Sequence, residues 1–307
     1  MTGNTLGWVI VAFVLYLLMM IAIGAFYAKG NNNSEDYFLG GRKLNGFVAA
    51  LSAQASDMSG WLLMGLPGAI YLTGVGGDGW IAIGLFIGTT LNWLFIATKL
   101  RRYTIRANNS VTLPTYFENR FHDEKKVLMA VSSITIVVFF LVYCASALSA
   151  GGQLFESVFG IDYHVALTIG ALVVLVYTFL GGFTAVCVTD FIQGMLMLVG
   201  ILAVPLFAYH FLTTGGTTLS AGLEASGAES ANFLNLMKNG DGSNNIISVI
   251  SGLGWGLGYF GMPHILVRFM AVRDEKEMTK SKATAISWVA LSLGFAVFIG
   301  ILGRAYL

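Results

Sequence analysis

The residue with the clearest chemical potential in this sequence is Asp57, which lies inside a long and otherwise uncharged apolar segment. An ionised carboxylate at the middle of a membrane costs about 2.5–3.5 kcal/mol on insertion scales, so residues of this kind are usually functional. Ser56, Ser59 and Gly60 beside it weaken a helix, and Pro67 follows soon after. We therefore expect an interrupted helix with Asp57 at the break, where unwound main-chain carbonyls could bind a small hard cation.

A second apolar segment, residues 246–271, shows the same kind of interruption. It has five glycines in the ten residues that begin at Gly252, and Pro263 follows them. A continuous helix is improbable there because glycine and proline are the poorest helix formers. Trp255, Tyr259 and Pro263 are four residues apart and share one face of any helical part. The two aromatic rings could enclose an apolar ring or an aliphatic group.

The composition indicates that lipid is the main solvent of this chain. Its 307 residues are 56% hydrophobic and only 11% charged, whereas roughly a quarter of a soluble domain is charged. The net charge of +1 gives no support for a nucleic-acid partner. Segments of about 20 apolar residues predict spanning helices, since lipid leaves backbone groups no partner outside the chain. Eight segments qualify: 6–27, 45–73, 79–98, 127–155, 164–181, 186–211, 246–271 and 283–303.

The basic residues predict the orientation of these segments. All Lys and Arg residues except Lys238 and Arg304 lie where loops are cytoplasmic if the N-terminus is outside. Segments 45–73 and 246–271 then cross in opposite directions, five segments apart. A pair of interrupted helices in two inverted halves is typical of the midplane site of a secondary transporter. We expect a peripheral helix and inner loop (1–43), a five-helix repeat (44–211), an outer loop (212–245) and the start of a second, inverted repeat (246–307).

Several polar residues have simpler interpretations. Asp190 either caps the start of its helix or lies on an ion path. His264 and Arg268 follow the second interruption, where contacts with a loop or the membrane surface are expected. Gly182 and its neighbour predict a turn. We see no nucleophile–base pair and no metal-ligand spacing of His or Cys, so an intramembrane enzyme is disfavoured.

Longer runs resemble a known family. The run Leu51–Gly68 and the run Gly254–Gly261, with Pro263 just after, resemble the proline-transporting branch of the sodium/solute symporter family. Residues 112–121 and 177–185 are similar to further motifs of that family. The resemblance implies an all-α integral membrane protein with a LeuT-type inverted repeat. Because members have about thirteen helices, it also implies that this chain is truncated after the eighth.

The resemblance implies a function and a set of site residues. The function is sodium-coupled uptake of L-proline across the cytoplasmic, or inner, membrane, with Na⁺ as the coupling ion and with neither a catalytic residue nor an organic cofactor. A sodium symporter for another small organic solute and a membrane solute-sensor module are the alternatives. Protein partners are unknown. The implied sodium-binding or coupling residues are Ala55, Asp57, Met58 and Asp190, with the ion held by main-chain oxygens of Ala55 and Met58. The implied substrate-binding residues are Ser59, Gly60, Tyr143, Trp255 and Tyr259.

Overall fold

The computed structural model describes residues 3–306, with side chains from residue 7 onward, and it is helical almost throughout. Within those residues no strand forms, and only two isolated β-bridges occur. In chain order the elements are α1 (Gly3–Ala28), α2 (Ser34–Leu39), η1 (Gly40–Arg42), α3 (Gly46–Gly60), η2 (Trp61–Gly65), α4 (Leu66–Thr73), α5 (Val75–Leu91), η3 (Asn92–Ala97), α6 (Thr98–Arg106), α7 (Leu113–Phe121), α8 (Val127–Phe159), α9 (Tyr163–Thr214), α10 (Leu219–Ala225), α11 (Ser230–Phe233), α12 (Ile246–Trp255), η4 (Gly256–Gly261), α13 (Pro263–Ala271) and α14 (Glu275–Tyr306).

The long helices match a membrane protein. In residues 3–306, five helices are long and apolar enough to span a membrane, or six if the bent pair 246–261 and 263–271 counts as one. The longest, α9, is two arms joined at Gly182, whose φ of 61° and ψ of −157° interrupt the helix. The predicted turn at this glycine is therefore confirmed, and the predicted segments 164–181 and 186–211 are the two arms of α9.

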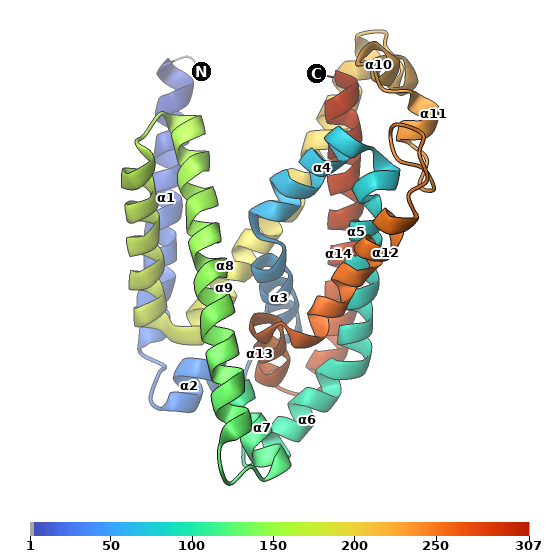
Figure 1. The fold of residues 1–307 in the computed structure, drawn as a ribbon. Coiled ribbons are helices and arrows are strands. Elements are labelled where there is room, and N and C mark those ends of the chain that lie inside the picture. The colour runs from blue at the N-terminus through green and yellow to red at the C-terminus, as the bar shows by residue number, and fades with distance from the viewer. Residues whose placement is uncertain (1–2, 307) are drawn as a thin grey trace.

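The helices form two groups linked by α9 (Figure 1). On one side, α1 and α8 pack against the first arm of α9; on the other, α14 packs against α3, α4 and α5, and α12 packs against α5. The second arm of α9 crosses between the groups and contacts α3 and α14. Both termini lie at the same end of the molecule (Figure 1). This arrangement places α3 at the centre, between the two groups.

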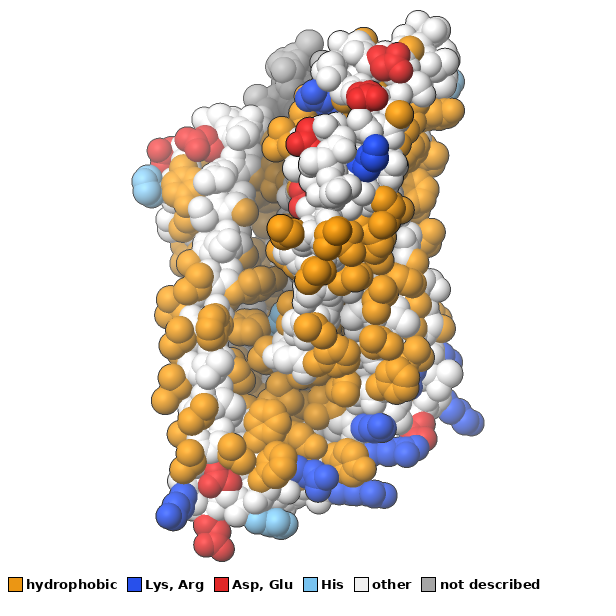
Figure 2. Space-filling model, turned by 45° about the vertical axis from the view of Figure 1, so that its right-hand side comes forward, with side chains coloured by type: hydrophobic (Ala, Val, Ile, Leu, Met, Phe, Trp, Pro, Cys, Tyr) orange, Lys and Arg blue, Asp and Glu red, His pale blue; other side chains and the backbone are white. Residues whose placement is uncertain are grey.

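Apolar and basic side chains occupy different zones of the surface along the long axis of the molecule. Figure 2 shows a broad band of hydrophobic side chains around the middle, with Lys and Arg concentrated at the end opposite the termini. Large apolar side chains such as Trp8, Phe26 and Phe139 are about 70% exposed. Lipid is the solvent that such a surface requires, because a water-soluble protein exposes only small apolar patches.

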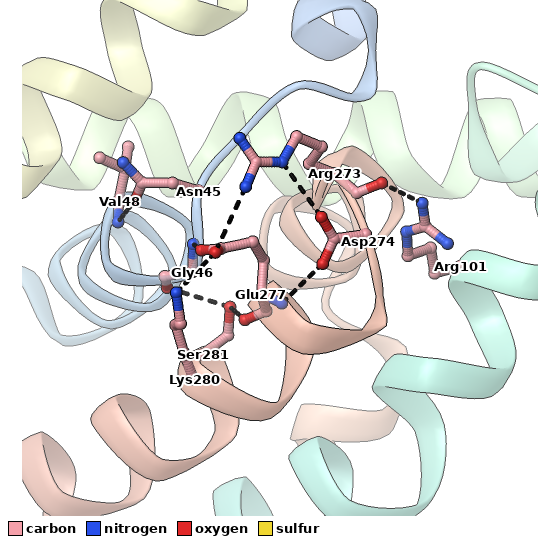
Figure 3. A network of polar contacts seen from close by, with 9 residues as sticks. All are labelled: Asn45, Gly46, Val48, Arg101, Arg273, Asp274, Glu277, Lys280 and Ser281. Atoms are coloured by element: carbon pink, nitrogen blue, oxygen red, sulfur yellow. Dashed lines mark hydrogen bonds and ion pairs between the residues drawn. The ribbon is translucent and has the colours of Figure 1, made fainter.

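At the basic end, hydrogen bonds join the start of α3 to the start of α14 (Figure 3). The Gly46 amide donates to Glu277 Oε2 at 2.6 Å, and Ser281 Oγ donates to the Gly46 carbonyl at 3.0 Å. The backbones approach so closely that a Cβ on Gly46 would lie 2.4 Å from the Glu277 carbonyl oxygen. Asn45 caps α3 by accepting the Val48 amide at 2.9 Å. Glycine is thus required at residue 46 for packing.

The connection between α13 and α14 is held from two sides. Arg42 donates to the Met270 carbonyl at 2.8 Å, and the Leu44 amide donates to the Ala271 carbonyl at 3.2 Å. From α6, Arg101 donates to the carbonyls of Val272 and Arg273. Four successive carbonyls, two at the end of α13 and two in the connection, therefore accept hydrogen bonds from other parts of the chain.

Residues 212–245, which the sequence predicts to be an outer loop, contain two short helices, α10 and α11, and pack onto the ends of the bundle. Leu223 and Phe233 form a small core with the ends of α9 and α14. Asn245 donates to the Gly76 carbonyl at 2.8 Å, and Trp80 donates to the Leu236 carbonyl at 2.7 Å. The loop is thus an ordered cap over α5.

Candidate solute and cation site at two broken helices

The first predicted interruption is present, but it lies at Ser59. This residue has φ 44° and ψ −155°, a conformation that costs a non-glycine residue free energy. The Trp61 amide donates to the Met58 carbonyl, and the chain continues as the wide turns of η2. Asp57 itself stays in the helix, so the prediction that the break falls at Asp57 was wrong by two residues. A carboxylate fits a helix sterically, and only the backbone angles of Ser59 depart from it.

The second predicted interruption is a tight helical stretch followed by a bend. The chain turns by 47° between η4 and α13. Met262 is extended and Pro263 starts α13, where its missing amide hydrogen costs nothing. The glycines here also allow close packing: a Cβ on Gly256 would lie 2.2 Å from the Gly84 carbonyl oxygen of α5. The sequence indicated only that these glycines weaken a helix, and the close packing against α5 was not predicted.

A hydrogen bond joins the two broken helices. The Tyr259 hydroxyl of η4 donates to Asp57 Oδ2 of α3 at 2.5 Å. Tyr259 is only 1% exposed, and Asn92 donates to its carbonyl at 2.9 Å. The structure therefore brings two of the implied site residues together, in a partly buried contact that crosses from one predicted repeat to the other.

Asp190 belongs to a second polar cluster, on another face of α3. Its Oδ2 accepts from Ser52 Oγ at 2.7 Å, from Ser56 Oγ at 3.0 Å and from Arg268 Nη2 at 2.9 Å. The side chains of Arg268 and Asp190 are 7% and 12% exposed. Arg268 also donates to the His264 carbonyl at 2.5 Å. This is a buried ion pair between α9 and α13.

The expectation for Arg268 and one of the two alternatives for Asp190 were wrong. Arg268 does not reach toward the membrane surface, because its guanidinium points into the bundle and lies over the Phe183 ring, 5.5 Å from its centroid. Asp190 does not cap a helix, because it lies eight residues after the interruption at Gly182 and its carboxylate accepts from side chains. The partners of both residues are far away in the chain, which is why local patterns did not reveal them.

A cavity of about 370 Å³ opens beside the first interruption, a size found among small-molecule sites. Three of the five implied substrate residues, Ser59, Gly60 and Tyr143, line it. The Tyr143 hydroxyl donates to the Ser56 carbonyl at 3.1 Å, which fixes α8 against α3. Trp61, which the family resemblance did not single out, lines the cavity directly after Gly60.

The other two implied substrate residues do not line this cavity. Trp255 is 49% exposed, does not line the cavity, and stacks on Trp61 with 5.8 Å between ring centroids and 24° between planes. Tyr259 is buried with its hydroxyl on Asp57. Trp255 therefore contacts Trp61, and Tyr259 contacts Asp57, and both of these partners lie within two residues of Ser59.

The four implied sodium-binding or coupling residues do not form one cluster. Asp57 contacts Tyr259, whereas Asp190 contacts Ser52 and Ser56 on a neighbouring face of the same helix. The Met58 carbonyl accepts a hydrogen bond from one amide, that of Trp61. Because a carbonyl oxygen has two lone pairs, the second remains for a cation. Among the described residues no group of three His, Cys, Asp or Glu side chains is arranged for a metal ion. Main-chain and hydroxyl oxygens are the remaining candidate ligands.

Comparison with known proteins adds a family and a fold. Residues 37–307 match the model of the sodium:solute symporter family. A sodium/proline symporter of Salmonella typhimurium is 45% identical over 297 residues, which cover 97% of this chain and 57% of that protein. The corresponding symporters of Escherichia coli K12 and Staphylococcus aureus JH9 are 44% and 43% identical, covering 97% and 96% of this chain and 57% and 56% of those proteins. The chain thus spans somewhat more than half the length of these relatives.

A solved structure of a Na⁺-coupled sialic acid symporter, in a substrate-bound outward-open state, superposes with a TM-score of 0.77 at 21% identity. The superposition covers 95% of this chain and 60% of that one. It confirms the predicted all-helical, LeuT-type fold.

Proposed function

This chain belongs to the sodium:solute symporter family, and from that membership we propose that it takes up L-proline across the cytoplasmic membrane in a sodium-coupled, alternating-access cycle. Its family and its curated relatives are transporters by name. The observation that carries the proposal is the cavity beside the Ser59 break, next to the bond from Tyr259 to Asp57. That bond joins the two interruptions, as a site shared by two repeats requires.

In the proposed site the solute carboxylate binds at the start of η2. Ser59 stands at the break and Gly60 directly after it, and the positive end of a helix favours an anion. The sodium ion binds on the other side of the break, at the main-chain oxygens of Ala55 and Met58, and Asp57 balances its charge. Asp190 acts in coupling, through its bonds to Ser52 and Ser56 on the same helix. One charge that moves through 100 mV supplies about 2.3 kcal/mol.

We propose the orientation from the charge distribution. The basic end of the molecule (Figure 2) faces the cytoplasm, so both termini described here face outward. The predicted division into residues 1–43, 44–211, 212–245 and 246–307 accompanies this proposal, with 44–211 as the first repeat and 246–307 as the start of its inverted partner.

The test is uptake of labelled L-proline into vesicles that contain the protein as its gene encodes it, with and without an inward sodium gradient. Coupling between two ligands is typically 1–3 kcal/mol, so sodium is expected to raise the apparent proline affinity by about 5–150-fold. Asp57→Asn should abolish this sodium effect. Asp241→Asn, the same change in the exposed outer loop, is the matched control and should retain it. Proline uptake that does not depend on the sodium gradient, or an unchanged sodium effect in Asp57→Asn, would refute the proposal.

A further inference from the structure

Trp61 occupies a distinctive place in the cavity beside the first interruption. It is the first residue of η2, directly after Gly60, and it is partly buried. It is the one tryptophan among the residues that line this cavity. The opposite wall comes from α8: Tyr143, Ser146, Ala147, Ala150, Gly151 and Leu154. An aromatic side chain on one helix thus faces mainly small side chains on another.

The space between these walls depends on the α8 residues being small. A Cβ built on Gly151 meets nothing within 4 Å, whereas one built on the adjacent Gly152 lies 2.8 Å from the Tyr163 ring. Gly152 is therefore required for packing of α8 on α9, and Gly151 is not. The absence of a side chain at Gly151 leaves cavity volume, and a larger residue there would project into it.

Trp61 stacks on Trp255 of the other interrupted helix. The two rings stack with centroids 5.8 Å apart and planes 24° apart, an offset arrangement that aromatic pairs favour. Trp61 lines the cavity and Trp255 does not. The two residues come from the two interrupted helices, so the stack also joins those helices. A solute in the cavity could therefore contact Trp61 directly, whereas Trp255 contacts the cavity wall only through the Trp61 ring.

We propose that Trp61 is the specificity-determining contact for the apolar ring of the solute, and that Trp255 is a positioning residue that acts through it. This inference rests on the proposed function and deepens it. The slot between the Trp61 ring and the small residues of α8 favours a compact, flat, cyclic amino acid over an open-chain one. The five-membered ring of proline has this shape.

The experiment measures sodium-driven uptake kinetics in the same vesicles, with L-proline as substrate and L-alanine and L-valine as open-chain competitors. Trp61→Leu should raise the proline KM by about three- to tenfold, the range expected for loss of an aromatic contact. Its maximal rate should stay within about twofold, because the change removes a binding contact. The preference for proline over the open-chain competitors should fall, and Trp61→Phe should restore most of it.

Three further variants separate this role from a structural one. Gly151→Leu should weaken proline uptake by filling the slot. Gly200→Leu, the same change at a glycine with open space outside the cavity, should not. Trp255→Leu should raise the proline KM in the unsubstituted protein but change it little in the Trp61→Leu background, because residues that act through one contact are not additive.

The outcomes distinguish the two proposals. Sodium-dependent proline uptake together with an unchanged KM and preference in Trp61→Leu overturns the inference and leaves the proposed function standing. Additive effects of Trp61→Leu and Trp255→Leu overturn the positioning role of Trp255. Absence of sodium-dependent proline uptake by the unsubstituted protein overturns both.

Discussion

Replacing Arg268 by methionine should destabilise the fold strongly. Methionine keeps an unbranched apolar chain but removes a guanidinium that is 7% exposed and donates to Ser52, Ser56, Asp190 and the His264 carbonyl. Asp190 would keep two hydroxyl donors and lose its only positive partner within the described residues. Breaking a buried ion pair from one side costs about 3–5 kcal/mol, and neither side chain is exposed enough for water to reduce that estimate much.

The double variant tests the cause of that loss. Arg268→Met combined with Asp190→Asn removes both charges, so no unpaired buried charge remains. Buried ion pairs replaced by neutral groups of similar size are often no less stable than the original. We therefore expect the double variant to regain at least about 2 kcal/mol of what Arg268→Met loses, a coupling typical of contacting residues.

The assay is reversible unfolding of the purified protein in mixed micelles, followed by tryptophan fluorescence. Arg102→Met is the matched control, because Arg102 and Glu275 form an ion pair whose side chains are 53% and 56% exposed. Exposed pairs contribute little, so this variant should unfold close to the unsubstituted protein. Unchanged unfolding of Arg268→Met, or a double variant no more stable than the single one, would refute the reasoning.

Three other predictions concern the contacts around α3 and α14. Gly46→Ala places a Cβ 2.4 Å from the Glu277 carbonyl and should cost about 1–3 kcal/mol in the same unfolding assay; a loss below 0.5 kcal/mol would contradict it. Tyr259→Phe removes the donor to Asp57 and should cost about 1.5–3 kcal/mol, the range for a hydrogen bond to a charged group, while Tyr306→Phe, at an exposed site, should be neutral. Asp274 accepts the Glu277 amide and the Arg273 guanidinium, which lower the pKa of its carboxyl below 3.8. That stabilisation is present above the ordinary pKa and is lost as the pH falls through the lowered one, so Asp274→Ala should lower the melting temperature at pH 7 and much less at a pH below the lowered pKa.

The sequence predicted the spanning helices well because lipid imposes a simple rule on composition. A long apolar segment must be a helix, and clustered glycines with a proline must disturb it. The position of the first break was harder to predict. Ser56, Asp57, Ser59 and Gly60 all weaken a helix, so composition alone could not select Ser59 as the residue whose backbone departs from helical angles.

The contacts that build the site depend on residues distant in the chain, and this limited prediction from sequence. Arg268 and Asp190 are 78 residues apart, and nothing local to either residue indicates the other. Trp61 was hidden for another reason. It follows Gly60 in a run of apolar residues, where a tryptophan is expected as core packing, and only the cavity beside it suggests another role.

The contacts of α3 bear on how the proposed transport cycle could turn over. At the basic end, α3 is fastened to α14 through Gly46, and the adjoining Leu44 pairs with the α13–α14 connection through two main-chain hydrogen bonds. Inward release would require these contacts to separate. Hydrogen bonds of this kind contribute about 0.5–1.5 kcal/mol each, so a few of them together are comparable to the ~2.3 kcal/mol that one charge gains across 100 mV. The energy gained by a single sodium ion is therefore of the size that this opening needs. Tyr259 and Arg268 of the second broken helix donate to Asp57 and Ser56 of α3, so these bonds lie where a rearrangement of α3 on sodium binding would be transmitted.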